Sequence, residues 1–136
     1  MWPLFEDRFG RVLRQFDMVL DGVSNGDAFT WSEQIRYSDG EIHDRVWDIT
    51  KIGDGRYEGR TESLVGVARG ESVDANSFRW RYTLKLGGLS LRFDDWLYAQ
   101  NENVFINRAR ATKFGLMVAS TTVLLTREPM VAARAA

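Results

Sequence analysis

The sequence predicts an all-β protein that forms a closed antiparallel barrel of the up-and-down type with about eight strands. Segments in which apolar and polar residues alternate follow one another from about Arg14 to Arg127. Each ends at a turn signal, of which Ser38-Asp39-Gly40 and Gly87-Gly88 are the clearest, so neighbouring strands are expected to pair antiparallel. A sheet of this size with one apolar face normally closes on itself, because closure removes the exposed strand edges.

Short polar links separate the candidate strands. Ahead of the first strand, the apolar residues between Phe5 and Leu13 recur at roughly helical spacing. This spacing predicts a short N-terminal helical segment at one end of the barrel. The expected fold is therefore lipocalin-like (calycin-type), with a helix wrapped in a strongly curved sheet as the alternative. The expected strands are Arg14–Leu20, Ala28–Tyr37, Ile42–Lys51, Arg56–Val67, Asn76–Leu86, Leu89–Tyr98, Val104–Lys113 and Leu116–Arg127.

The turn at Ser38-Asp39-Gly40 sets the register of the second and third candidate strands. As a three-residue loop with its glycine in the left-handed conformation, it pairs Glu33 with Arg45 and Trp31 with Trp47. The inward face then becomes aromatic and aliphatic around one pair of opposite charges. A two-residue loop would mix polar and apolar residues on each face, so we favour the first register.

The later strands add aromatic and charged residues to the same inward face. Gly87-Gly88 is a strong hairpin signal that brings Asp95 inward. A turn near Asn101-Glu102 then pairs Asp95 with Arg108, whereas a shift of two residues pairs it with Arg110. The other expected inward residues are Tyr57, Gly59, Thr61, Ser63, Phe78, Trp80, Tyr82, Leu84, Leu91, Phe93 and Leu97, of which the small ones on the fourth strand should leave space.

Length, charge and cysteine content limit the function classes. The 136 residues fit one domain, expected at 1–127, with a flexible C-terminal tail at 128–136. Lys and Arg total 18 against 19 Asp and Glu, so the basic excess of a nucleic-acid-binding protein is missing. No apolar stretch reaches the roughly 20 residues of a membrane helix, so no integral membrane segment is expected. There are no cysteines, which excludes disulfides, thiol catalysis and cysteine-ligated metals.

Familiar catalytic and cofactor-binding motifs do not occur in the sequence. It has no phosphate loop, dinucleotide fingerprint, nucleophile elbow or HExxH motif. His43 is the only histidine, so we predict no metal and no cofactor, and we expect His43 at the barrel rim. Because the start shows no signal-peptide pattern, the chain as written is expected in the cytoplasm. If a native signal segment was trimmed, the expectation becomes a periplasmic or membrane-anchored protein.

Two pairs of opposite charge are the main candidates for a binding site. Glu33 with Arg45 is either a structural ion pair that fixes strand register or a contact for the polar head of a ligand. Asp95 with Arg108 admits the same two interpretations. Aromatic residues beside small and charged ones are typical of pockets for small molecules. The expected ligand-binding residues are Trp31, Glu33, Arg45, Trp47, Tyr57, Trp80, Tyr82, Asp95 and Arg108.

Short motifs over nearly the whole chain resemble those of a bacterial family of unknown function, whose members are often labelled as candidate lipoproteins. The motifs are Asp7-Arg8-Phe9-Gly10-Arg11, Tyr37-Ser38-Asp39-Gly40, Arg45-Val46-Trp47, Tyr57-Glu58-Gly59, Phe93-Asp94-Asp95-Trp96-Leu97, Asn107-Arg108-Ala109 and Lys113-Phe114-Gly115. Members of that family typically begin with a lipoprotein signal and its cysteine. Their genes often lie near genes of cyclopropane fatty acid synthesis, so the resemblance implies a link to lipids. It is consistent with a calycin-like fold and supplies no catalytic residue.

These observations favour a non-enzymatic barrel that binds a small hydrophobic molecule with an anionic or polar head, such as a fatty acid or lipid fragment. Arg45 and Arg108 would meet the head, because arginine suits carboxylate and phosphate groups. The first alternative is a barrel enzyme, an isomerase, cyclase or hydrolase, with Glu33 or Asp95 as general acid or base. The second is a structural or assembly module with a packed barrel. The oligomeric state stays open.

Overall fold

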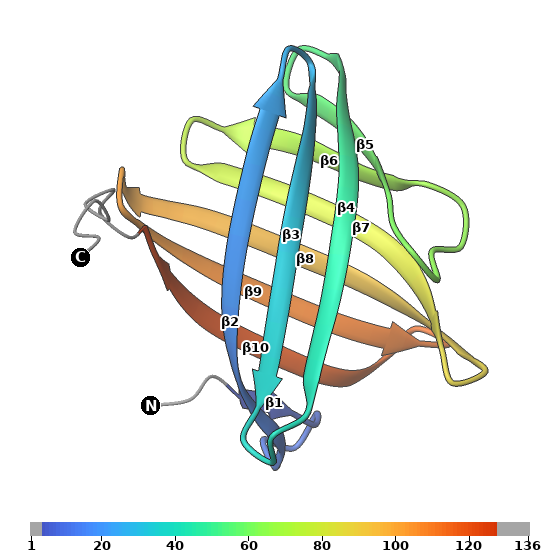
Figure 1. Cartoon of the computed structure of the whole chain (residues 1–136). Helices are drawn as coiled ribbons and strands as arrows, with labels where there is room; N and C mark the ends of the chain where they lie inside the picture. Colours follow the sequence, from blue (N-terminus) through green and yellow to red (C-terminus); the bar gives the residue numbers. More distant parts are fainter. Residues whose placement is uncertain (1–3, 128–136) are drawn as a thin grey trace.

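Ten antiparallel strands close into one barrel in the computed structural model, which describes residues 4–127 (Figure 1). Each strand pairs with its neighbours in sequence, and the first also pairs with the last, so the barrel is of the up-and-down type. The strands are β1 (Leu4–Glu6), β2 (Val12–Asn25), β3 (Ala28–Tyr37), β4 (Ile42–Gly53), β5 (Arg56–Arg60), β6 (Ala68–Asp74), β7 (Ser77–Leu86), β8 (Leu89–Asn101), β9 (Val104–Lys113) and β10 (Leu116–Thr126). Figure 1 shows β2, β3 and β4 crossing β7–β10 at a steep angle. Inside the barrel the two groups meet, since Trp47 of β4 packs against Trp80 and Tyr82 of β7.

The N-terminal helical segment expected over Phe5–Leu13 is wrong. Phe5 lies in β1, which pairs with β2 on one side and with β10 on the other. The turn that follows is built by Asp7, whose Oδ1 accepts hydrogen bonds from the backbone N–H groups of Phe9 and Arg11, both at 2.9 Å. Because such local side-chain bonds compete with helical backbone bonds, the helical spacing of the apolar residues does not decide the structure here.

The fourth expected strand, Arg56–Val67, is two elements separated by a loop. β5 ends at Arg60, and β6 begins at Ala68. Between them Ser63 and Gly66 adopt positive φ angles of 65° and 75°, which an extended strand cannot contain. Together with β1, this split gives ten strands where about eight were expected.

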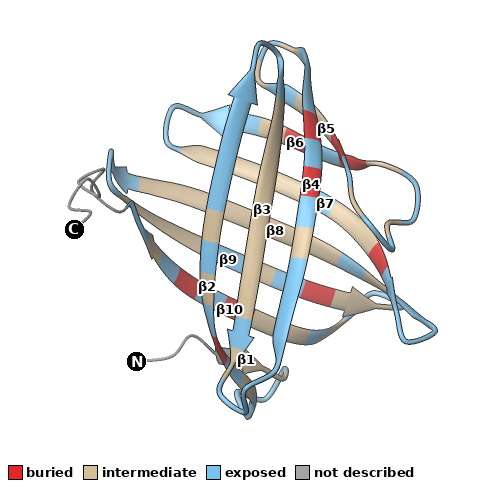
Figure 2. Ribbon diagram, viewed as in Figure 1, coloured by how far each residue is buried: buried red, intermediate tan, exposed pale blue. Residues whose placement is uncertain are grey.

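The register predicted for β3 and β4 is confirmed. Glu33 pairs with Arg45, and Trp31 pairs with Trp47. In the middle of β4, from Arg45 to Thr50, buried or half-buried positions alternate with exposed ones (Figure 2), and buried Trp47 packs with Ala68 of β6 in the hydrophobic core. The three-residue loop therefore places the inward and outward side chains of both strands as the hydrophobic pattern requires.

The pairing predicted between Asp95 and Arg108 is wrong, and so is the alternative with Arg110. Asp95 pairs with Ala109 instead. A β-bulge just before Asn101 adds one residue to β8 and shifts the register by one position. Because strand side chains alternate, a shift of one residue sends Arg108 to the outer face, where it is exposed.

The described residues form strands and turns, with no helix among them. Accordingly, residues 4–127 contain no helix long and apolar enough to cross a membrane. The flexible tail expected at 128–136 lies outside the described residues.

Candidate functional site

A cavity of about 850 Å³ lies inside the barrel. Its wall is built mainly from rings that project inward from strands on both sides. Cavities of this size with apolar walls and a few polar groups are typical of sites that hold one small molecule. The aromatic residues of the wall are Phe5, Phe16, Phe29, Trp31, Tyr37, Trp47, Tyr57, Phe78, Trp80, Tyr82 and Phe93.

Two inward glycines allow these rings to pack closely. A Cβ atom at Gly59 would lie 2.5 Å from Cη2 of Trp80, and a Cβ atom at Gly70 would lie 2.5 Å from Cζ of Phe78. Trp80 also packs edge-on against Trp47, with ring centroids 5.3 Å apart. The space that Gly59 was expected to leave is therefore filled by the Trp80 indole, and the cavity lies beyond it.

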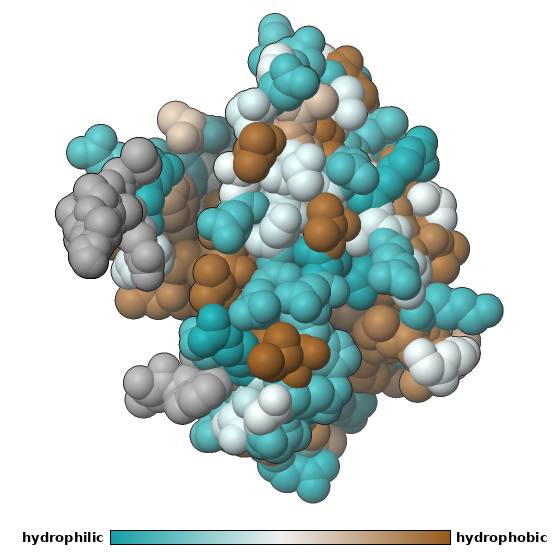
Figure 3. Space-filling view, viewed as in Figure 1, coloured by the Kyte–Doolittle hydropathy of each residue, from teal (hydrophilic) through white to brown (hydrophobic). Residues whose placement is uncertain are grey.

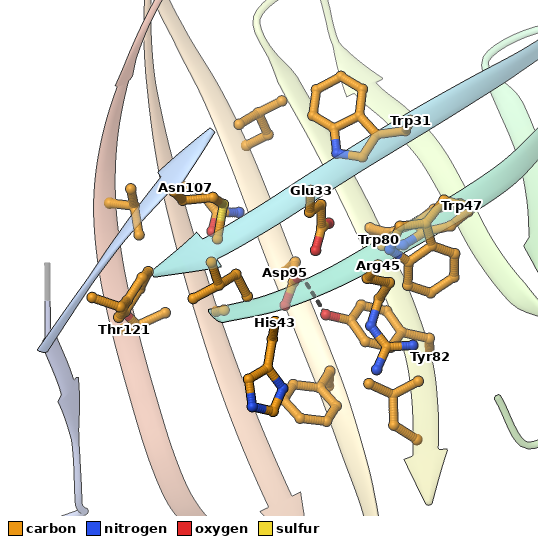
Figure 4. A pocket seen from close by; sticks show the side chains of 18 of the residues that line it. Trp31, Glu33, His43, Arg45, Trp47, Trp80, Tyr82, Asp95, Asn107 and Thr121 are labelled. Carbon is orange, nitrogen blue, oxygen red and sulfur yellow. Dashed lines mark hydrogen bonds between the residues drawn. The ribbon is translucent and has the colours of Figure 1, made fainter. Parts of the chain in front are cut away.

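Four polar side chains come together on the cavity wall. Glu33 comes from β3, Arg45 from β4, Tyr82 from β7 and Asp95 from β8. Figure 4 shows Glu33, Asp95 and Tyr82 pointing toward one another, with Arg45 beside Tyr82. Strands far apart in the sequence thus supply one polar group inside a largely aromatic cavity.

Asp95 has one hydrogen bond and one unpaired oxygen. The Tyr82 hydroxyl donates to Oδ2 over 2.9 Å. Oδ1 is buried and has no hydrogen-bond partner among the described residues. Burial raises the pKa of Asp95 to about 7, although the Tyr82 hydrogen bond lowers it, and the charge on Glu33 raises it further. The carboxyl group therefore exchanges its proton near neutral pH.

Glu33 and Tyr82 also have raised pKa values, and burial is the main cause for both. The positive charge of Arg45 lowers the pKa of Glu33, and two neighbouring indole N–H groups act in the same direction. The charges of Asp95 and Glu33 raise the pKa of Tyr82 further, well above its usual value. Tyr82 therefore keeps its proton and stays a hydrogen-bond donor to Asp95.

Arg45 is opposite Glu33 in register, but these two described side chains form no ion pair. The Nη1 group of Arg45 donates hydrogen bonds to the backbone oxygen of Glu62 at 2.6 Å and to Oγ1 of Thr61 at 3.3 Å. The Thr61 hydroxyl in turn donates to the backbone oxygen of Val46 at 2.7 Å. Arg45 therefore anchors the loop after β5 and places a positive charge on the cavity wall.

His43 is exposed and lies on the cavity wall near the turn between β3 and β4. Its Nε2 atom is bonded to the carboxylate of Glu41, and its ring packs edge-on against Tyr37 with centroids 5.5 Å apart. Across residues 4–127, no group of three or more His, Cys, Asp or Glu side chains is placed to hold a metal ion.

The cavity contains all the predicted ligand-binding residues except Arg108. Asn107 lines the cavity instead, and its Nδ2 donates to the backbone oxygen of Trp96 at 3.3 Å. The register expected from the sequence gives Asn107 no role, because that register lacks the bulge in β8. The available signal is the pair Asn101 and Asn103: Oδ1 of Asn101 accepts a hydrogen bond from the Asn103 backbone N–H at 2.8 Å, which makes the β8–β9 turn an Asx turn.

A family model described as Protein of unknown function (DUF3833) matches residues 1–127. The chain belongs to this family. The match covers the whole barrel, so every residue of the cavity lies within the part of the chain that DUF3833 defines. No curated protein and no solved structure matches the chain significantly. The DUF3833 description names no activity, so the function has to be inferred from the cavity.

Proposed function

We propose that this DUF3833 protein binds a small, largely apolar molecule with a polar or anionic head inside its barrel, and that fatty acids or lipid fragments are the ligand class. The observation that carries the proposal is the cavity of about 850 Å³, whose aromatic wall surrounds a group of incompletely paired polar side chains. The second alternative, a module with a packed barrel, does not explain a cavity of this size.

The aromatic wall supports binding of the apolar part of the ligand. Moving apolar surface from water into such a cavity is favourable by about 25 cal/mol per Å². The Tyr82 ring already packs between Trp47 and Phe93, with its centroid 5.0 Å from that of Trp47 and 5.1 Å from that of Phe93. The wall is therefore held in place before the ligand enters, which reduces the entropy lost on binding.

The polar group supports binding of the head. Arg45 supplies a positive charge, and Asp95 supplies an oxygen that no described group satisfies. A carboxylate head beside Glu33 and Asp95 requires at least one of these acids to hold its proton, which burial favours in both. A protonated acid can then donate a hydrogen bond to the ligand carboxylate while Arg45 balances its charge.

Ligands with one tail and different heads test the proposal. We expect dodecanoic acid to quench the tryptophan fluorescence of the purified protein saturably, with weaker binding of dodecanol and dodecylamine. Native mass spectrometry of the protein, followed by lipid extraction, should detect a bound molecule of the same class. Saturable binding of none of the three, together with no co-purified lipid, would contradict the proposal. Tighter binding of dodecylamine than of dodecanoic acid would contradict the proposal that the head is anionic. It would not contradict the proposal that the cavity binds an apolar tail.

One observation favours a second candidate function, the barrel enzyme. Asp95 lines the cavity, has a pKa of about 7 and is bonded to a tyrosine and not to an arginine. A carboxyl group that titrates near neutral pH inside a cavity is suited to general acid–base catalysis. A panel of small ester and unsaturated carbonyl substrates tests this function. Turnover that survives in Asp95→Asn would argue against it.

A further inference from the structure

The outer face of β7, β8 and β9 is basic, although the chain as a whole has a net charge of −1. These three strands are described throughout, and Asp94 is the one acid at their outward positions. Arg79 binds Asp94 through two hydrogen bonds of 2.8 and 2.5 Å, which neutralises that acid. The outward cations of the face are Arg79, Arg81, Lys85, Arg92, Arg108 and Arg110. Of these, Arg81 pairs with Glu71 of the neighbouring strand β6 at 3.5 Å.

A groove of about 330 Å³ lies at one end of this face, between the β7–β8 and β9–β10 turns. Its lining combines the cations Arg92 and Lys113 with the hydroxyl groups of Thr83, Ser90 and Thr112. Within the described residues, no ion pair joins either cation to an acid, and the Lys113 ammonium lies 4.7 Å from the centroid of the Phe114 ring as a cation–π pair. Cationic side chains together with hydroxyl donors are typical of phosphate recognition.

The turns beside the groove expose large apolar side chains. Phe114 is 91 % exposed, Leu116 59 %, Leu89 51 % and Leu86 39 %. We call these four residues the apolar corner. Over β2, β3 and β4, in contrast, apolar side chains are isolated spots among hydrophilic ones (Figure 3).

Phe114 is an unusual residue for its position. Its φ angle is 52° and that of Gly115 is 78°, so both central residues of the β9–β10 turn are left-handed. Such turns favour Asn or Gly, because an ordinary side chain strains the backbone there. A strained and fully exposed aromatic residue contributes little to folding, and strain of this kind is concentrated at functional sites.

We propose that the apolar corner and the adjacent basic groove dock on a membrane surface that contains anionic phospholipids. The apolar corner enters the interfacial layer, and the groove receives a lipid phosphate between Arg92 and Lys113. Apolar residues that insert together with basic residues that meet anionic headgroups are the two elements of peripheral membrane binding.

The apolar corner favours a membrane over a nucleic acid or a free phosphate compound. A phosphate compound in water would bind in the groove alone, so its binding would not explain why Phe114 and Leu89 are exposed. Nucleic acid needs phosphate contacts along an extended track, whereas the two groove cations lie beside two turn tips. A bilayer interface uses both features at once, because its headgroups lie directly above its apolar layer.

The docking site is close to the cavity inside the barrel. Lys85 and Leu86 at the end of β7 and Gly87 of the β7–β8 turn are exposed and also line the cavity, so the cavity reaches the surface beside the apolar corner. The docking proposal does not depend on ligand binding inside the barrel. If both hold, docking would place the opening of the cavity next to the lipid layer.

Vesicle sedimentation tests the proposal with the full chain. We expect the protein to bind vesicles of phosphatidylcholine mixed with phosphatidylglycerol, to bind phosphatidylcholine vesicles weakly, and to lose affinity as salt rises. The variant Arg92→Gln/Lys113→Gln should bind anionic vesicles roughly 30-fold more weakly, because it removes two charges from the contact. Phe114→Asn, which suits the turn and should fold at least as well, should bind roughly ten-fold more weakly.

A matched control removes the same charge elsewhere. Arg36→Gln/Arg60→Gln takes two exposed arginines from the outer surface of β3 and β5 and should bind anionic vesicles as the wild type does. An equal loss in this control would overturn the proposal, since the effect would then follow net charge alone. So would unchanged vesicle binding by both the groove variant and Phe114→Asn.

Two further probes separate the sources of phosphate. Glycerol 3-phosphate is titrated into labelled protein and followed by amide chemical shifts, and a short single-stranded oligonucleotide competes with anionic vesicles. We expect weak glycerol 3-phosphate binding and no effective competition. Tight glycerol 3-phosphate binding that ignores Phe114→Asn would identify a soluble-phosphate site, and oligonucleotide binding tighter than vesicle binding would identify a nucleic-acid surface. Either result overturns membrane docking. Dodecanoic acid binding inside the barrel is measured separately, so failure of membrane docking would not count against the proposed function.

Discussion

Tyr82 and Asp95 lie diagonally across the β7–β8 pair, and the tyrosine hydroxyl donates the one hydrogen bond that the Asp95 carboxyl group receives. This contact joins a phenol that keeps its proton to an acid whose pKa is about 7. The other charged groups that face them are Glu33 on β3 and Arg45 on β4, while Asp94 acts on Asp95 from the outer side of β8.

Asp95→Asn should change how stability depends on pH. The folded pKa of about 7 exceeds 3.8, the ordinary pKa of an aspartate, so between these pH values the folded state binds the proton more tightly than the unfolded state. The contribution of Asp95 to the free energy of unfolding is therefore fully present below about pH 4. It falls by up to about 4 kcal/mol as the pH rises from there through 7. The difference in urea unfolding free energy between Asp95→Asn and the wild type should therefore grow in favour of the variant from pH 4 to 8. Exposed Asp48→Asn is the control, and a parallel pH dependence in wild type and Asp95→Asn would refute the assignment.

Tyr82→Phe should raise the pKa of Asp95. The hydroxyl stabilises the charged carboxylate, so its removal favours the protonated acid. Carbon-detected NMR titration of labelled aspartate carboxyl groups measures the shift directly. Tyr98→Phe removes a hydroxyl from a residue stacked on Trp96 and should leave the Asp95 titration unchanged. A lowered or unchanged pKa in Tyr82→Phe would show that the hydrogen bond does not act as described.

Gly59→Ala should destabilise the barrel by about 1–3 kcal/mol, the usual effect of overpacking a core. The new Cβ would lie 2.5 Å from Trp80, whose ring is itself packed against Trp47 and cannot move freely. Gly22→Ala is the matched control, because its Cβ would meet Trp31 at an ordinary 3.5 Å. Thermal unfolding of both variants measures the contrast. Equal stability of the two would mean that the Trp80 indole does not occupy the Gly59 position in solution.

The variants Arg45→Gln and Arg108→Gln compare two arginines that the sequence predicted equally as contacts for the ligand head. Arg45 lines the cavity, whereas Arg108 is exposed on the outer face. Under the proposed function, Arg45→Gln should weaken dodecanoic acid binding by roughly ten-fold or more, the loss of one charge-assisted hydrogen bond. Arg108→Gln should bind as the wild type does. The assignment fails if the Arg108 variant loses more affinity than the Arg45 variant in fluorescence titration.

Binding of dodecanoic acid should weaken as the pH rises through about 7. A ligand carboxylate in the cavity requires a protonated acid beside it, and Asp95 gives up its proton in that range. Dodecylamine should show the opposite trend, because its positive head pairs with ionised Asp95. Calorimetric titrations at pH 6 and pH 8 compare the two ligands. In Asp95→Asn both trends should shrink, and a trend that persists there would have to come from another group.

The sequence by itself determined the barrel class and the register of β3 against β4. The turn Ser38-Asp39-Gly40 and the alternation beside it are local, and together they placed Glu33 opposite Arg45 and Trp31 opposite Trp47. The same period-two pattern identified most of the cavity wall, because inward and outward residues of a strand are fixed once one of them is known.

Tertiary structure alone decided which charges meet inside the barrel. The bulge before Asn101 moves Arg108 outside by one residue, and the loop after β5 draws the Arg45 guanidinium away from Glu33. Asp95 is left with Tyr82 as its partner and with one unpaired oxygen. Period-two alternation predicts which side of the sheet a residue faces only while the register is unbroken. Whether an extra residue lies in a turn or in a bulge depends on backbone pairing across the whole closed sheet.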